Sequence, residues 1–212
     1  MSRIDLAGFK ERKNESKKRG FLRGLGVACF IKGTGGAPTE NVEIRFISGS
    51  RIDLVTGTQS IGQGHETTFP QILAKYLGIP SEGVNLKQPD TDLIETGGGH
   101  GSSRATYMGG SALHYAAAEV IKKGKQLATN VLEVAVQDIL FENGRFVVDG
   151  TDREVTLFEL AAVAEKNGSS LNTYNLWERK AMTFPNGVHA AELDVDSETG
   201  KVKLNRYLVV DD

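Results

Sequence analysis

The sequence predicts an α+β fold in which helices pack on mixed or largely antiparallel sheets. Three observations predict it: alternating runs typical of half-buried strands, apolar residues at helical spacing, and turn residues between these segments. The chain has 212 residues, of which 39% are hydrophobic and 25% are charged, which suits one domain or two small ones. We expect residues 1–20 to form a linker or peripheral segment and residues 21–212 to form a partial domain.

Alternating apolar and polar residues in the first third of the chain predict strands. The expected strands cover residues 23–32, 42–47 and 52–56, and the last two form a hairpin around the turn Ser48–Ser50. Further along, residues 84–87 form a short strand, and a turn rich in aspartate follows at residues 89–92.

A helix is expected after the loop Gly57–Gly64, because apolar residues recur there every three or four positions. They are Phe69, Ile72, Leu73, Tyr76 and Leu77. Pro70 lacks the N–H that a helix interior needs, so it should lie in the first turn, and the helix should begin near residues 66–68. Gly78 is expected to end the helix.

Helical patterns dominate the next part of the chain. A long helical stretch follows Arg104, and Gly109–Gly110 within it costs about 1 kcal/mol per glycine relative to alanine, which indicates close packing there. A separate helix is expected over residues 125–136. Thr156 and Glu159 match a capping box at the start of a helix that runs to Lys166.

The remaining segments predict strands. Residues 139–148 are expected to form a hairpin with Glu142–Gly144 at its turn. The last third of the chain supplies strands at residues 171–184, 187–195 and 202–210. Strands and helices are therefore interspersed along the whole sequence, as an α+β fold requires.

Composition argues against several classes of protein. The net charge is −2 and no basic stripe is visible, so we expect no nucleic-acid partner. The basic cluster between Lys10 and Arg23 is interpreted as a solvated segment. No apolar run is long enough to span a membrane, so the cytoplasm is the expected location. Cys29 is the single cysteine, permits no disulfide within the chain, and is expected to be buried in a strand.

Two glycine-rich loops each lead from a strand into a helix. The first glycine loop covers Gly57–Gly64, and the second glycine loop covers Gly97–Arg104. A helix N-terminus has unpaired N–H groups and about half a positive charge, so it binds phosphates and other oxygen-rich anions. Gln63 adds an amide able to read a heterocycle edge, while Ser102 and Ser103 add hydroxyl groups. These loops together suit a cofactor with a polar ring system and a phosphate.

Other chemistries fit the sequence less well. The spacing of Gly57 and Gly62 matches a P-loop, but Gln63 stands where lysine is needed. His65 and His100 could ligate a metal with nearby carboxylates, although their spacing matches no metal motif. A role in capping a helix, or in supporting a site without touching its ligand, is favoured. We therefore name no metal ligand. Two alternatives stay open: a small metal-dependent enzyme that uses these histidines, and a non-catalytic assembly module.

An ordered set of blocks resembles the molybdenum-binding large subunits of the xanthine dehydrogenase, aldehyde oxidase and carbon monoxide dehydrogenase family. The blocks are Gly62–Ala74, Leu77–Pro80, Asp90–Asp92, Gly97–Arg104 and Gly110–Ala112, with Arg19–Ala28 upstream and Val209–Asp212 downstream. The resemblance runs from about residue 5 to the end of the sequence. The order of the blocks makes it much more specific than any one block.

The resemblance implies the molybdenum-cofactor-binding domain of that family. The implied cofactor is a molybdopterin, often as the cytosine dinucleotide, at which an aldehyde or an N-heterocycle is hydroxylated with oxygen from water. Electrons would leave through 2Fe-2S clusters and FAD, commonly on partner subunits. By position, the resemblance assigns the cofactor to two groups of residues: Gly62, Gln63 and Gly64 beside the pterin, and Gly101, Ser102, Ser103 and Arg104, of which Arg104 would hold the phosphate side.

The sequence also departs from the family's pattern. It lacks the Gly-x-Gly-Glu-like segment that carries the family's general base, so we name no catalytic residue. The loops that bear the substrate-facing aromatic and arginine are absent too, as is the cofactor loop expected after Asp212. We therefore expect a central piece of the large subunit, inactive in isolation. Its expected partners are the remainder of that subunit, an FAD subunit, an iron–sulfur subunit and a small-molecule substrate.

Overall fold

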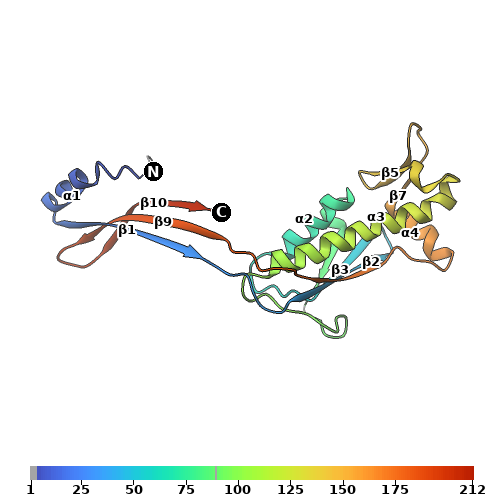
Figure 1. The fold of residues 1–212 in the computed structure, drawn as a ribbon, viewed down its shortest axis with the longest axis horizontal. Helices are drawn as coiled ribbons and strands as arrows, with labels where there is room; N and C mark the ends of the chain where they lie inside the picture. The colour runs from blue at the N-terminus through green and yellow to red at the C-terminus, as the bar shows by residue number, and fades with distance from the viewer. Residues whose placement is uncertain (1–3, 89) are drawn as a thin grey trace. The chain divides into compact units, whose positions relative to one another are not determined.

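The structure of the protein, a computed structural model, describes residues 4–88 and 90–212. Its contacts divide the chain into two compact units, one formed by Met1–Thr34 with Met182–Asp212 and the other by Gly35–Ala181. Helices pack on antiparallel and mixed sheets within these units, so the expected α+β fold class is confirmed (Figure 1). The predicted domain boundary at residue 20 stays a prediction.

The first unit is a three-stranded antiparallel sheet with one helix. The strands follow the order β1 (Phe21–Ile31), β9 (Asn186–Asp196) and β10 (Val202–Asp211), and a bulge interrupts the pairing of β9 with β10. Helix α1 (Phe9–Lys18) packs on β1. The segment that we expected to be a linker or peripheral therefore contains a helix that is part of this unit.

A cluster of ion pairs joins α1 to the sheet. Arg12 donates to the two carboxylate oxygens of Glu192 at 2.8 and 2.7 Å, and Arg23 donates to those of Asp194 at 2.8 and 2.9 Å. Glu192 is 2% exposed and Asp194 is 4% exposed. Such bidentate contacts are stronger than neutral hydrogen bonds. The interpretation of the basic segment as solvated is therefore wrong at Arg12 and Arg23, because both meet carboxylates that come from distant β9.

Several apolar side chains on one face of this sheet are exposed. Leu22 of β1 and Val202 of β10 both pair with Val195 of β9 and therefore lie on one face of the sheet. Leu204 and Tyr207 of β10 pair with the residues two and four positions earlier in β9, which puts them on the same face. These four side chains are between 56% and 61% exposed. Cys29 is also exposed, so the expectation that it is buried is wrong. The alternation of apolar and polar residues in β1 correctly predicted a strand. It does not indicate whether a second layer of structure covers the sheet.

The second unit contains a four-stranded mixed sheet. The strand order is β4 (Val84–Lys87), β3 (Arg51–Thr56), β2 (Thr39–Ile47) and β8 (Thr173–Glu178). The hairpin of β2 and β3 is antiparallel as predicted, whereas β3 and β4 run parallel. Strand β8 is shorter than the predicted span of residues 171–184.

Two helices cover this sheet and form the main core with it. Helix α2 (His65–Leu77) connects β3 to β4, and the long helix α3 (Gly110–Leu132) lies along β2 and β8 (Figure 1). The core contains the fully buried side chains of Ile44, Leu54, Phe69, Leu73, Leu113 and Val120. In the part of the chain that the structure describes, no helix has both the length and the apolar character to cross a bilayer.

Helix α2 begins slightly earlier than predicted. It starts at His65, so Pro70 lies in the second turn and not in the first. Its missing N–H removes one helical hydrogen bond. The predicted end is confirmed, because Gly78 adopts the left-handed conformation with φ +62° and ψ +37°.

Helix α3 is one continuous helix, so the separate helix predicted over residues 125–136 is wrong. Gly124, the residue before the predicted start, lies inside α3. A Cβ atom at Gly124 would lie closer than 3.0 Å to the ring of Phe146. The glycine is therefore explained by the close packing of a ring from β6 (Arg145–Val148) and not by a helix end.

A small antiparallel sheet and a further helix complete the second unit. The sheet consists of β5 (Ile139–Glu142), β6 and β7 (Glu154–Thr156), and α4 (Leu157–Lys166) follows directly. The predicted hairpin turn is confirmed, with Asn143 and Gly144 both at positive φ. Both hydrogen bonds of the predicted capping box between Thr156 and Glu159 are present.

Candidate functional site

The two glycine loops touch each other at their bases. A Cβ atom on Gly57 would lie closer than 3.0 Å to the Cα atom of Gly97, and the reverse substitution would crowd the backbone of Gly57 in the same way. The Gly99 N–H donates to the Gly57 carbonyl oxygen at 3.2 Å. Only glycine permits two backbones to pass so closely. These contacts hold together two segments that are 40 positions apart in the sequence, from position 57 to position 97.

The two loops also line one open hollow of about 730 Å³, which we call the glycine-loop hollow. This volume lies in the range of small-molecule and cofactor sites. The lining residues come from the first glycine loop, the start of α2, the second glycine loop and the π-helical turn Ala105–Gly109. They are Ile61, Gly62, Gln63, His65, Thr68, His100, Ser103, Ala105 and Thr106. Single π-helical turns are frequent at functional sites.

In the first loop, Gln63 stabilises the loop itself. Its Oε1 accepts from the Ile61 N–H at 2.6 Å, and its Nε2 donates to the Gln59 carbonyl oxygen at 3.1 Å. Gly64 is the N-cap residue of α2 and has φ +81°. Because it is a glycine, it has no side chain that could cap the helix. Gly62 and Gln63 line the hollow, so the resemblance and the geometry indicate the same segment.

His65 is the most enclosed polar residue in the lining. It is 3% exposed, and its ring stacks on that of Phe69 with centroids 4.8 Å apart and planes 8° apart. Its Nδ1 is buried and has no hydrogen-bond partner among the described residues. Burial lowers the pKa of the imidazole, while neighbouring Glu66 opposes this shift and His100 adds to it. Of the two roles favoured for this histidine, capping is not observed, because α2 has no side-chain cap, and the supporting role stays a prediction.

The second loop contains unusual backbone. Ser102 and Ser103 both have positive φ, 60° and 57°, in the left-handed region. For residues other than glycine this conformation costs on the order of 1–3 kcal/mol each and concentrates at functional sites. Ser103 lines the hollow, whereas the Ser102 carbonyl accepts from the Gly35 N–H at 3.0 Å. The loop is thus held in a strained form by its neighbours.

Gly101 lies in the same loop without any steric reason for being glycine. A Cβ atom there would meet nothing within 4 Å, and its φ is not among the positive values. The chain itself therefore tolerates a side chain at this position. Open space beside a glycine is what the close approach of a ligand to the backbone requires.

Arg104 does not line the glycine-loop hollow. It is 1% exposed and pairs with Glu40 at 2.5 Å. Its guanidinium also donates to the carbonyl oxygens of Ala37, Thr39 and Gly99. The contact with a phosphate that the resemblance assigned to Arg104 stays a prediction. Sequence reasoning missed Glu40, since no local signal links a residue at the start of a strand to an arginine 64 positions away.

The open alternatives receive unequal support. Among residues 4–88 and 90–212, no three His, Cys, Asp or Glu side chains are grouped so that they could hold a metal ion. His65 and His100 do line the same hollow, but no described carboxylate completes a ligand set with them. The assembly-module alternative calls for an exposed apolar surface without a ligand hollow, whereas the protein has both features.

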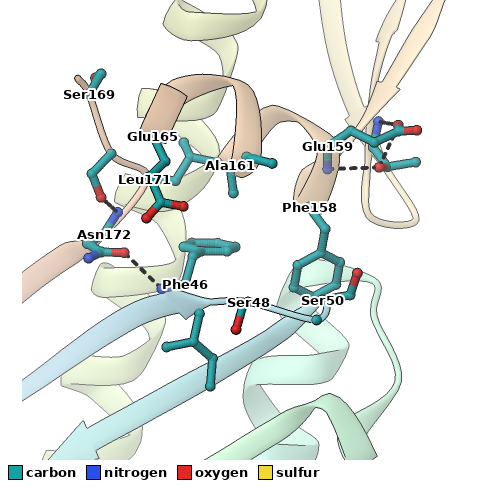
Figure 2. A pocket seen from close by; sticks show the side chains of 15 residues that line it. Phe46, Ser48, Ser50, Phe158, Glu159, Ala161, Glu165, Ser169, Leu171 and Asn172 are labelled. Carbon is teal, nitrogen blue, oxygen red and sulfur yellow. Dashed lines mark hydrogen bonds between the residues drawn. The ribbon is translucent and has the colours of Figure 1, made fainter. Parts of the chain in front are cut away.

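A second hollow, of about 800 Å³, lies away from the glycine loops. Figure 2 shows Phe46 of β2 and Phe158 of α4 facing it, with Asn172 at one side. Two of its polar side chains already have partners: Glu159 belongs to the capping box, and the Asn172 Oδ1 accepts from the Phe46 N–H at 2.8 Å. We therefore favour the glycine-loop hollow, where an enclosed nitrogen has no partner.

Comparison with protein families gives a match over the whole chain. The family described as "Molybdopterin cofactor-binding domain" matches residues 1–212. The 6-hydroxypseudooxynicotine dehydrogenase complex subunit gamma of Paenarthrobacter nicotinovorans is 34% identical over 216 residues, which cover 96% of this chain and 27% of that protein. The carbon monoxide dehydrogenase large chain of Afipia carboxidovorans is 32% identical over 228 residues, covering 98% of this chain and 28% of that one.

Solved structures show the same relationship. Reconstituted CO dehydrogenase from Oligotropha carboxidovorans superposes with a TM-score of 0.88 at 29% identity, covering 100% of this chain and 29% of that chain. Quinoline 2-oxidoreductase from Pseudomonas putida 86 gives a TM-score of 0.84 at 27% identity, covering 99% and 29%. The chain therefore spans less than a third of the length of these relatives.

Proposed function

We propose a function from one premise: the chain belongs to the molybdopterin cofactor-binding domain family. On this premise the protein contributes two of the loops that hold a molybdenum–pterin cofactor in an oxidoreductase. The reaction would be the hydroxylation of an aldehyde or an N-heterocycle. The observation that carries the proposal is the meeting of the two glycine loops in one hollow.

The residues of this hollow fit an oxygen-rich anionic ring compound. Two helical segments begin there, and the N–H groups of a helix start favour negative charge. Gly101 follows the lining residue His100 and has open space beside it, and the ring of His65 belongs to the wall of the hollow. Both features leave room for a ligand. When bound, the molybdenum centre supplies the chemistry that transfers water-derived oxygen to a substrate carbon. The protein's part is to bind and orient the cofactor.

Each predicted residue then has a distinct task. Gly62 and Gly101 leave room for the cofactor, and Gln63 keeps the first loop in shape through its two backbone contacts. Ser103 offers a hydroxyl at the wall of the hollow. Arg104 supports the second loop from behind, because its guanidinium is occupied by Glu40 and three carbonyl groups. Gly64 and Ser102 set the backbone direction on either side.

The wider assembly is part of the same proposal. The protein would act with the remainder of a large subunit and with subunits that carry FAD and 2Fe-2S clusters, in the cytoplasm. The names of its relatives include a "complex subunit gamma" and a "large chain", which supports an assembly of several parts. The cofactor would carry the cytosine dinucleotide. Because the chain spans less than a third of these relatives, we expect it to be inactive alone.

The test is to purify the native complex that contains this protein and to measure its cofactor content. We expect the purified assembly to contain molybdenum by mass spectrometry and pterin by fluorescence after oxidation. Gly101→Leu should fill the open space and remove most of both without changing the melting temperature. Gly24→Leu is the matched control, because Gly24 also has no atom within 4 Å of an added Cβ. An assembly without molybdenum and pterin, or full retention in Gly101→Leu, would overturn the proposal.

A further inference from the structure

His65 has a polar group that the protein leaves without a partner. Its ring lies at the start of α2, stacks on the ring of Phe69 and is almost fully enclosed. Buried polar atoms are paired in the great majority of cases, so each exception calls for a reason. The first turn of α2 does not supply one, since the histidine caps nothing there.

The position of the ring decides which nitrogen could meet a ligand. Nδ1 is enclosed by the protein, while the ring forms part of the wall of the glycine-loop hollow. This leaves Nε2 as the nitrogen that can reach a molecule in the hollow. A neutral imidazole has one N–H and one lone pair. With the proton on Nε2, the enclosed Nδ1 keeps only a lone pair, which avoids a buried N–H without an acceptor.

The charges around His65 favour the neutral form. Burial is the largest influence and lowers the pKa, and the nearby His100 acts in the same direction. Glu66 is the one described group that opposes it, but its carboxylate accepts from the Ser60 hydroxyl at 2.9 Å. A neutral donor keeps its hydrogen bond across the neutral pH range.

We propose that His65 binds the cofactor directly, by donating a hydrogen bond from Nε2 to an anionic oxygen of the molecule in the glycine-loop hollow. This rests on the proposed function, which supplies the ligand class: a pterin with phosphate oxygens. The stacking partner Phe69 fixes the ring plane, so the donor is oriented before the ligand arrives. Preorganisation of this kind increases affinity because less freedom is lost on binding.

Three substitutions separate binding from packing. His65→Phe keeps the ring, its burial and the stack but removes both nitrogens. His65→Gln places an amide donor near the position of Nε2, and His65→Asn places one near Nδ1. If the histidine has only a packing role, the phenylalanine variant should retain the cofactor best of the three. If the histidine binds the ligand, the glutamine variant should retain the cofactor best.

The experiment measures cofactor retention in the purified assembly. We expect His65→Phe and His65→Asn to release molybdenum and pterin about tenfold faster during gel filtration, which corresponds to the loss of one good hydrogen bond. His65→Gln should stay within about threefold of the wild type, since part of one hydrogen bond is kept. His114→Phe is the control, because His114 lies on α3 among Tyr76 and Tyr115 and does not line this hollow.

The outcomes distinguish this inference from the proposed function. A wild-type assembly that contains no molybdenum or pterin would overturn both. A loaded wild type, with loss in Gly101→Leu but unchanged release in His65→Phe, would overturn the role of His65 alone. Melting temperatures of the cofactor-free proteins show whether each variant folds, and we expect His65→Phe to be at least as stable as the wild type because the apolar stack is kept.

Discussion

Arg104 and Glu40 form a buried ion pair between the second glycine loop and the start of β2. The arginine Nη1 lies 2.5 Å from the glutamate Oε2, and both residues are 1% exposed. The same guanidinium binds the carbonyl oxygens of Thr39 at 2.7 Å and Gly99 at 3.1 Å. One side chain thus connects the second glycine loop to the sheet.

Breaking this pair should be costly. Arg104→Met leaves the Glu40 carboxylate buried without a partner, for which we expect a loss of about 3–5 kcal/mol in the free energy of unfolding. Urea unfolding followed by circular dichroism measures it. The double variant Arg104→Met/Glu40→Leu removes both charges and should recover a large part of the loss. A single variant within about 1 kcal/mol of wild type, the size of an exposed pair, would contradict this account.

The crossing of the two glycine loops should tolerate no side chain. Gly57→Ala places a methyl group against the backbone of Gly97, so we expect a loss of about 1–3 kcal/mol from overpacking. Thermal unfolding gives the size of the effect. Gly24→Ala has open space around the new methyl group and should change stability little. Equal stability of both variants would show that the loops are not held in contact.

Gly124 offers a test in which helix propensity and packing predict opposite signs. Propensity alone predicts that Gly124→Ala stabilises α3 by about 1 kcal/mol. The ring of Phe146 occupies the space that the methyl group needs, so we expect a loss of about 1–3 kcal/mol instead. Adding Phe146→Leu should reduce the penalty of the alanine in a double-mutant cycle. A stabilising single substitution would refute the packing explanation.

The ion cluster of the first unit should make that unit sensitive to acid. Contact with Arg23 lowers the pKa of Asp194 from 3.8 to about 2, although burial opposes the shift. The pKa of Glu192 is also lowered, mainly by its hydrogen bond from Arg12. Because these values are lower in the folded state, the stabilisation is complete above the ordinary pKa values and is lost as the pH falls toward about 2.

Calorimetry at pH values between about 6 and about 2.5 tests this dependence, because this range lies on both sides of the pKa of a free carboxyl group, about 4. Asp194→Asn should melt at a lower temperature at neutral pH and lose less on acidification than the wild type. Glu198→Gln, on an exposed turn of the same unit, controls for the change in net charge. Parallel curves for wild type and Asp194→Asn would contradict the prediction.

The open apolar face of the first unit should make the isolated chain associate with itself. Leu204 and Tyr207 are exposed by 57% and 56%, and contiguous apolar patches of this kind bind other apolar surfaces. Sedimentation velocity should show association that rises with concentration and falls in the double variant Leu204→Lys/Tyr207→Lys. Val136→Lys adds a similar charge at an exposed valine elsewhere and serves as the control. A monomer at all concentrations would contradict this expectation.

Local signals were sufficient for much of the fold. The hairpin at Asn143–Gly144 and the capping box of Thr156 with Glu159 were predicted because each depends on a few adjacent residues. The end of α2 at Gly78 follows the same logic. The prediction of a separate helix over residues 125–136 was wrong, because α3 continues through Gly124, whose missing side chain makes room for the ring of Phe146 from another element.

The candidate site divides in the same way. The sequence indicated both glycine loops and named Gln63 and Ser103, which line one hollow. It did not indicate that Glu40 occupies Arg104, or that the Nδ1 of His65 lacks a partner. Such facts depend on which residues surround a side chain. A single sequence does not show which distant residues become neighbours in the folded protein.

By itself, the sequence determined the fold class, several element ends and the two segments that form the candidate site, since hydrophobic period, caps and turns act over a few residues. Only the tertiary structure decided which of the predicted polar groups are available. Arg104 is enclosed by carbonyl groups and a carboxylate, whereas His65 lines a hollow and its Nδ1 has no partner among the described residues. Burial and hydrogen-bond partners come from residues distant in the sequence, and they determine whether a side chain can bind a ligand.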